Sequence, residues 1–109
     1  MIHEIKTPNE FNEAKANKAV AIYFHSPECS VCNVLLPKLD NMLMEYFPKL
    51  PLCVIKANEM LELCASLQVF VYPSVLIYFE GKETLRLSRN INLASLSKML
   101  ERPYDLMFC

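Results

Sequence analysis

Glycine, tryptophan and long apolar runs are scarce in this sequence. Among its 109 residues there is one glycine, Gly81, and no tryptophan. A single glycine leaves few positions for turns that need a positive φ angle, and it leaves no glycine-rich loop for a nucleotide phosphate. No apolar run reaches the ~18 residues of a membrane-spanning helix. The sequence also lacks a marked excess of charge of either sign, since the net charge is −1. The sequence therefore gives no electrostatic reason to expect binding to nucleic acid or to a membrane surface.

The first part of the chain also lacks the apolar stretch of a secretory signal peptide, because charged residues recur in it: Glu4, Lys6, Glu10, Glu13, Lys15 and Lys18. With Met1 as the natural start, we therefore expect a cytoplasmic protein. The sequence has five cysteines, at positions 29, 32, 53, 64 and 109. An odd number without a secretion signal disfavours a structural disulfide framework. Redox catalysis, metal binding and plain buried thiols remain.

Hydrophobic periodicity predicts one α/β domain over residues 1–109, with elements in the order βαβαβαββα. The predicted strands are 2–5, 19–25, 52–57, 74–80 and 83–88, and the predicted helices are 8–18, 29–47, 59–68 and 92–102. Thr7 is the expected N-cap of the first helix, and Pro103 is expected to end the last one and leave a short tail, 103–109. Alternating elements followed by a hairpin indicate a central mixed β-sheet with helices on both faces.

Cys29 and Cys32 form a Cys-x-x-Cys pair at the junction between the second predicted strand and the helix that follows it. A helix N-terminus offers unpaired N–H groups and a partial positive charge, and both favour a thiolate over a thiol. We therefore expect Cys29 to be the nucleophile, with a pKa lowered from ~8.5 to about 4–7, and Cys32 to resolve the mixed disulfide. A zinc site, an iron–sulfur cluster and two inert thiols are the alternatives, although this pair supplies only two metal ligands.

Two segments resemble the thioredoxin superfamily: IYFHSPECSVCNVLLPKL, from Ile22 to Leu39, and VYPSVLIYFEGKE, from Val71 to Glu83. The single residues that match the family's pattern are Pro37 within the active-site helix, Lys56 in a central strand, Pro73 and Gly81. The resemblance implies a thioredoxin fold and thiol–disulfide exchange with protein disulfides through Cys29 and Cys32. It implies no cofactor, and it implies an external thiol or reductase as the electron donor. A redox-inert binding module with the same fold is the alternative function.

The resemblance also implies where a substrate would bind. Pro73 matches the family's cis-proline beside the active site, and with Tyr72 it would hold an extended substrate strand through backbone groups. A proline that merely begins a strand is the alternative interpretation.

Several positions depart from the family's usual residues. Tyr23 stands where a buried acid is expected, His25 where a tryptophan is expected, and Val31 where the usual motif has a proline. Val31 restores a backbone N–H near the Cys29 sulfur, so we predict a more oxidising couple than that of the Gly-Pro form. We hypothesise that His25 or Tyr23 assists proton transfer when Cys32 reacts, the alternative being that both are packing residues. Lys56 is expected to tune the local field.

The remaining features carry weaker predictions. Tyr72, Arg86 and Arg89 alter the surface on which a partner would dock, so a dedicated substrate is one interpretation, and a solvated strand face is the other. Cys53 and Cys64 are expected to behave as small buried hydrophobes. The sequence does not indicate a role for Cys109.

Overall fold

The computed structural model describes residues 2–108 and contains one five-stranded sheet within them. The strands are β1 (Ile2–Glu4), β2 (Ala19–His25), β3 (Leu52–Lys56), β4 (Ser74–Phe79) and β5 (Lys82–Ser88), in the spatial order β1-β3-β2-β4-β5. Strands β1, β3 and β2 run parallel, whereas β4 pairs antiparallel with both β2 and β5. The predicted mixed sheet is confirmed, and its strand boundaries lie within one residue of those predicted.

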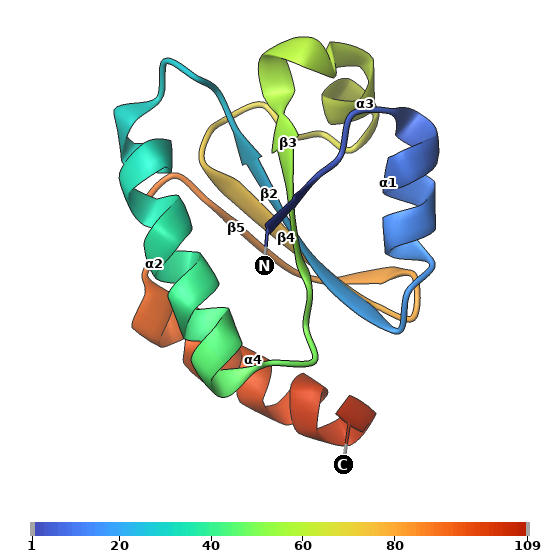
Figure 1. Cartoon of the computed structure of the whole chain (residues 1–109), viewed down its shortest axis with the longest axis vertical. Helices are drawn as coiled ribbons and strands as arrows, with labels where there is room; N and C mark the ends of the chain where they lie inside the picture. Colours follow the sequence, from blue (N-terminus) through green and yellow to red (C-terminus); the bar gives the residue numbers. More distant parts are fainter. Residues whose placement is uncertain (1, 109) are drawn as a thin grey trace.

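Helices cover both faces of this sheet, as predicted. They are α1 (Pro8–Lys15), α2 (Ser30–Tyr46), α3 (Leu61–Ser66) and α4 (Leu93–Phe108), and a short 3₁₀ helix, η1 (Ala57–Glu59), precedes α3. Figure 1 shows α2 and α4 together on one side of the sheet and α1 with α3 on the other. This arrangement is the thioredoxin fold that the sequence resemblance implies.

The alternation of side chains along β2 divides the core into two layers. Ala21 and Tyr23 pack with residues of α2 and α4, whereas Ile22 and Phe24 pack with residues of α1 and α3. All four side chains are fully buried. Successive residues of a strand point to opposite faces, so a strand that is covered on both faces reads as the continuous apolar run seen in the sequence.

The first helix begins as the sequence predicts. The Thr7 hydroxyl accepts a hydrogen bond from the backbone N–H of Glu10 at 3.1 Å, and Pro8 is the first helical residue. The carboxylate of Glu10 in turn accepts from the backbone N–H of Lys6 at 2.6 Å. The helix ends at Lys15, three residues before the predicted end.

The prediction that Pro103 ends the last helix is wrong, because α4 continues through it to Phe108. Proline inside a helix costs about 3 kcal/mol, since it lacks an N–H and crowds the preceding turn. Packing beyond the proline offsets that cost. The Tyr104 ring lies 5.1 Å from that of Phe47 and 4.8 Å from that of Phe108, and its hydroxyl accepts from the backbone N–H of Lys49 at 2.9 Å. The expected tail is therefore helical as far as Phe108, and Cys109 lies outside the described residues.

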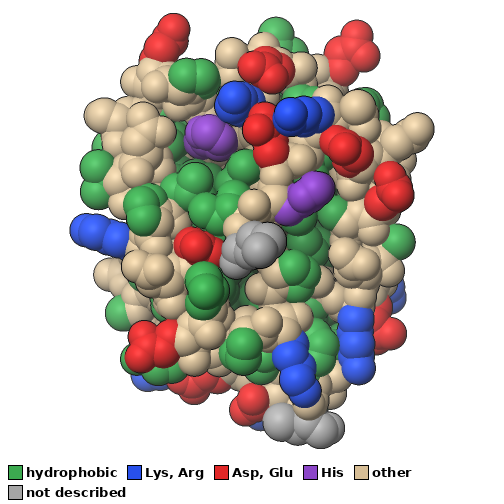
Figure 2. Space-filling view, viewed as in Figure 1, with side chains coloured by type: hydrophobic (Ala, Val, Ile, Leu, Met, Phe, Trp, Pro, Cys, Tyr) green, Lys and Arg blue, Asp and Glu red, His purple; other side chains and the backbone are tan. Residues whose placement is uncertain are grey.

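The surface carries mixed charge. Figure 2 shows acidic and basic side chains interspersed with apolar ones on the face that it presents. Within residues 2–108, no helix has both the length and the apolar character needed to cross a membrane.

Strand register brings three chain segments to one edge of the sheet. Ser74, the first residue of β4, pairs with Phe24 near the end of β2 and with Ser88 at the end of β5. The residues that leave β2, enter β4 and leave β5 are therefore neighbours. The Cys-x-x-Cys pair follows the first of these segments and the Tyr72–Pro73 dipeptide precedes the second.

Candidate functional site

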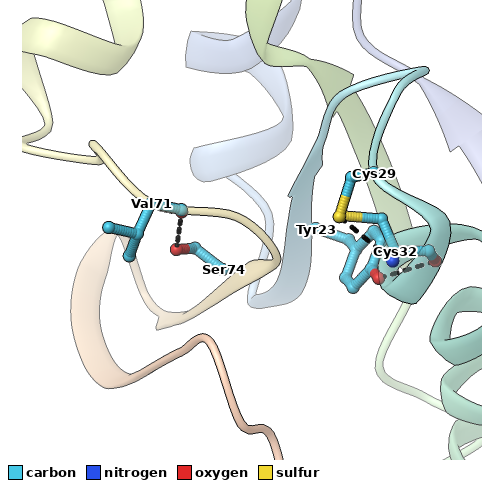
Figure 3. The surroundings of a disulfide bond; sticks show 5 residues. All are labelled: Tyr23, Cys29, Cys32, Val71 and Ser74. Carbon is cyan, nitrogen blue, oxygen red and sulfur yellow. Dashed lines mark hydrogen bonds between the residues drawn. A yellow bond between two sulfur atoms is a disulfide. The ribbon is translucent and has the colours of Figure 1, made fainter.

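Cys29 and Cys32 form a disulfide at the start of α2, with their Cα atoms 5.2 Å apart (Figure 3). Cys29 is the N-cap of the helix, and its sulfur accepts a hydrogen bond from the backbone N–H of Cys32 at 3.2 Å. Cys32 is fully buried, whereas Cys29 is only partly buried. Cys29 is therefore the more accessible of the two residues, and Cys32 lies behind it.

The start of α2 contributes to the electrostatic setting of Cys29. No acidic residue lies in the first turn of α2, so nothing on the helix cancels its partial positive end there. The donor to the Cys29 sulfur is the N–H of Cys32 and not that of Val31, whose side chain is 59% exposed. Cys32 supplies this N–H whatever residue occupies position 31. The contribution assigned to Val31 therefore stays a prediction.

Tyr23 takes the place of the expected buried acid and has a different contact. Its side chain is fully buried, and its hydroxyl donates a hydrogen bond to the backbone carbonyl of Cys32 at 2.8 Å (Figure 3). Burial raises the pKa of Tyr23 to about 12. The phenol therefore stays protonated at neutral pH and fixes the first turn of α2 against β2.

His25 lies two residues beyond Tyr23 and stacks on it, with ring centroids 6.0 Å apart. Burial, and next the charge of Lys56, lower the pKa of His25 from 6.5, against an opposing effect of Glu4. Lys56 is the register partner of His25 on β3, and its ammonium lies 3.8 Å from a carboxylate oxygen of Glu4. Lys56, which is expected to tune the local field, thus pairs with a partly exposed glutamate of β1.

The Tyr72–Pro73 peptide bond is cis. Two contacts fix the segment around it: the Ser74 hydroxyl donates to the backbone carbonyl of Val71 at 2.6 Å, and the Pro73 carbonyl accepts from the N–H of Arg89 at 2.9 Å. Sequence reasoning missed Ser74. The signal that could have found it is a polar residue at the start of an otherwise apolar strand. In the structure, Ser74 is only 1% exposed.

The structure separates the two arginines that the sequence analysis grouped together. The Arg86 guanidinium donates to the backbone carbonyls of Leu67 and Gln68, at 2.8 and 3.0 Å, and to the carboxylate of Glu83. Arg86 thus satisfies the last carbonyls after α3. Arg89 makes no such side-chain contact with the residues described.

Cys53 and Cys64 lie on the opposite face of the sheet from the disulfide, in the layer of α1 and α3. Both are buried free thiols, as predicted, and burial raises the pKa of each. The neighbouring Tyr72 hydroxyl opposes this effect on the pKa of Cys64. Within residues 2–108, no group of three or more His, Cys, Asp or Glu side chains lies close enough together to hold a metal ion.

Comparison with known proteins gives a consistent result. The family model described as Thioredoxin matches residues 3–102. The chain is 34% identical over 95 residues to thioredoxin-like protein YdfQ of Bacillus subtilis, a match that covers 87% of this chain and 84% of that protein.

Two solved structures share the fold at lower identity. A mutant thioredoxin from Halobacterium salinarum superposes with a TM-score of 0.83 at 18% identity, covering 93% of this chain and 88% of that one. Oxidised thioredoxin O2 from Arabidopsis thaliana superposes with a TM-score of 0.80 at 18% identity, covering 94% of each chain.

Proposed function

The chain belongs to the thioredoxin family and carries the cysteine pair of a thiol–disulfide oxidoreductase, and we propose that its substrates are protein disulfides. One observation carries the proposal most directly. The Cys29 sulfur caps the N-terminus of α2, partly exposed, within bonding distance of the buried Cys32 sulfur. A thiolate at that position is both stabilised and reachable.

In the first step, the Cys29 thiolate attacks one sulfur of a substrate disulfide. The substrate S–S bond breaks, a Cys29–substrate disulfide forms, and the departing substrate sulfur leaves as a thiolate that takes up a proton. In the second step, Cys32 loses its proton and attacks the Cys29 sulfur. The Cys29–Cys32 disulfide forms and the second substrate sulfur leaves.

The proton of Cys32 needs an acceptor, and the residue at the place of the expected buried acid is Tyr23 in this chain. The Tyr23 hydroxyl already donates to the Cys32 carbonyl, and its raised pKa keeps it protonated at neutral pH. The neutral His25 imidazole, two residues along the same strand, is the better acceptor. If a His25→Ala variant resolves the mixed disulfide at an unchanged rate, His25 does not have this role.

We assign substrate binding to Tyr72 and Pro73. The Pro73 carbonyl is occupied by Arg89, and the Val71 carbonyl by Ser74. Among the described residues, the backbone N–H and carbonyl of Tyr72 take part in none of the hydrogen bonds that hold the loops. They are therefore free to pair with an extended substrate strand. Pro37 and Lys56 would act at a distance, through the shape of α2 and the local field.

Regeneration needs an electron donor outside this chain. We propose a small thiol or a reductase, which would reduce the Cys29–Cys32 disulfide by the same exchange chemistry. The direction of net electron flow depends on the donor's potential. The cytoplasmic location stays a prediction.

The test uses a synthetic peptide with one internal disulfide, incubated with the reduced protein and with a Cys32→Ser variant. The reduced protein should release the peptide dithiol. The variant should stop at a mixed disulfide that mass spectrometry places on Cys29. Cys53→Ser combined with Cys32→Ser is the matched control and should trap the peptide equally well. Absence of both reduction and trapping would instead favour a redox-inert binding module.

A further inference from the structure

We propose that Arg89, which lines a depression at the start of α2, selects substrate segments that carry an acidic side chain beside the attacked disulfide. This inference rests on the proposed function. It adds a substrate class and a residue that determines it.

The depression lies between the start of α2 and the loop that joins β5 to α4. Its volume is about 410 Å³, and its lining residues are Val31, Leu35, Arg89, Asn90, Ile91 and Asn92. Val31 and Leu35 stand one turn apart on the same face of α2, so they form one apolar wall. Val31 begins this wall two residues after Cys29.

Arg89 is the only charged residue among the six that line the depression. Its guanidinium has no ion pair and no hydrogen bond with any residue in the described part of the chain, unlike that of Arg86. No lining residue carries a carboxylate that could neutralise it. The positive charge of Arg89 therefore faces whatever occupies the depression.

The backbone at Arg89 fixes the point from which this side chain extends. Arg89 has a φ of +64°, a left-handed conformation that disfavours side chains other than glycine and costs about 1–2 kcal/mol. Its N–H donates to the Pro73 carbonyl at 2.9 Å. Arg89 is thus hydrogen-bonded to the segment proposed to hold the substrate strand. Its backbone conformation would cost less free energy with glycine at this position.

The occupant follows from the lining. An apolar side chain would bury itself against Val31, Leu35 and Ile91, while Asn90 and Asn92 offer amide groups to a peptide backbone. A neighbouring Asp or Glu side chain would lie near Arg89 and gain an exposed ion pair, and a Lys or Arg side chain would be repelled. Exposed ion pairs are weak, so we expect selectivity of about three- to tenfold between acidic and basic peptides, declining as salt is added.

The experiment measures kcat/KM for three disulfide peptides that differ only beside the cysteines, where they carry Glu, Gln or Lys next to a leucine. Each peptide is tested with the unmodified protein, Arg89→Gln, Arg89→Lys and Arg102→Gln. All three substitutions at the two arginines keep an unbranched stem and a polar end. Arg102 is exposed on α4, so Arg102→Gln is the matched control for loss of one positive charge.

The expected result is a preference for the Glu peptide over the Lys peptide that disappears in Arg89→Gln, persists in Arg89→Lys and persists in Arg102→Gln. The difference should appear mainly in KM. Equal kcat/KM for the three peptides with the unmodified protein would overturn the inference while leaving the proposed function in place. A preference that survives in Arg89→Gln would do the same. Failure to reduce any of the three peptides would overturn the proposed function itself.

Discussion

The two faces of the sheet hold two kinds of cysteine. On the face of α2 and α4, Cys29 and Cys32 meet at a helix N-terminus, where one sulfur is partly exposed and accepts a backbone hydrogen bond. On the face of α1 and α3, Cys53 and Cys64 are packed among apolar side chains, and burial raises the pKa of each thiol. The residue type is the same on both faces. Position at a helix terminus, with access to solvent, is what distinguishes a reactive thiol from a packing residue.

The largest expected effect comes from removing one cysteine on each face in turn. Cys29→Ser should lower the rate of peptide-disulfide reduction by about a thousandfold or more, because the nucleophile is lost. Cys53→Ala should keep that rate within about twofold and cost only about 1 kcal/mol of stability through the cavity it leaves. Reduction kinetics and urea unfolding of both variants measure the two effects. Comparable losses of activity would contradict the assignment of the two faces.

A buried tyrosine on each face allows a second comparison. Tyr23 and Tyr78 lie on opposite faces, and burial raises the pKa of each to about 12. In the unfolded chain tyrosine ionises near pH 10, so between pH 10 and 12 the folded state binds more protons and stability falls as pH rises. Tyr23→Phe and Tyr78→Phe should each reduce this alkaline loss, by about 1.4 kcal/mol at pH 11.

Only Tyr23→Phe should also change the redox chemistry, because only Tyr23 contacts Cys32. At neutral pH we expect it to destabilise the protein by about 1–2 kcal/mol, since a buried carbonyl loses its donor. Urea unfolding at pH 7 and at pH 11 tests the effect on stability. The rate at which Cys32 resolves the mixed disulfide at pH 7 tests the effect on the redox chemistry. An equal kinetic effect of Tyr78→Phe would show that the phenol at position 23 has no special role.

A smaller effect tests the Cys29 environment itself. Val31→Pro removes one backbone N–H near the thiolate, and a hydrogen bond to a charged group contributes about 1.5 kcal/mol or more. We expect the midpoint potential of the Cys29–Cys32 couple to become more reducing by about 30 mV. An unchanged potential would mean that the N–H of Cys32, which proline at position 31 leaves in place, is the sole donor that matters.

The smallest expected effect concerns His25. The pKa of His25 is lowered from 6.5, so the unfolded chain takes up a proton at higher pH than the folded one. The contribution of neutral His25 to stability is complete above pH 6.5 and is lost as the pH falls below it. His25→Gln should flatten the decline in stability between pH 7 and pH 5, with His3→Gln, an exposed position, as the control. A decline of undiminished slope would contradict the direction of the shift.

The fold and the cysteine pair were within reach of the sequence, because both depend on local patterns. The apolar run of β2 and the cap at Thr7 are examples. The end of α4 was not, since the packing of Tyr104 on Phe47 offsets the local preference of Pro103 to end a helix. Arg86 and Arg89 could not be separated either. Arg86 reaches the carbonyls after α3, and the backbone of Arg89 pairs with Pro73. These contacts depend on tertiary structure, which the local sequence does not show.

A glutathione-buffered redox titration, with alkylation and mass spectrometry of the peptides that carry each cysteine, decides whether redox chemistry belongs to the α2 face. We predict that Cys29 and Cys32 are oxidised together and reversibly, with a midpoint above about −270 mV and no higher than about −180 mV. Cys53 and Cys64 should stay reduced over the whole range. A midpoint at or below about −270 mV would refute the more oxidising couple. No Cys29–Cys32 disulfide at any poise, or oxidation of Cys53 and Cys64 over the same range, would contradict the assignment of redox chemistry to the α2 face.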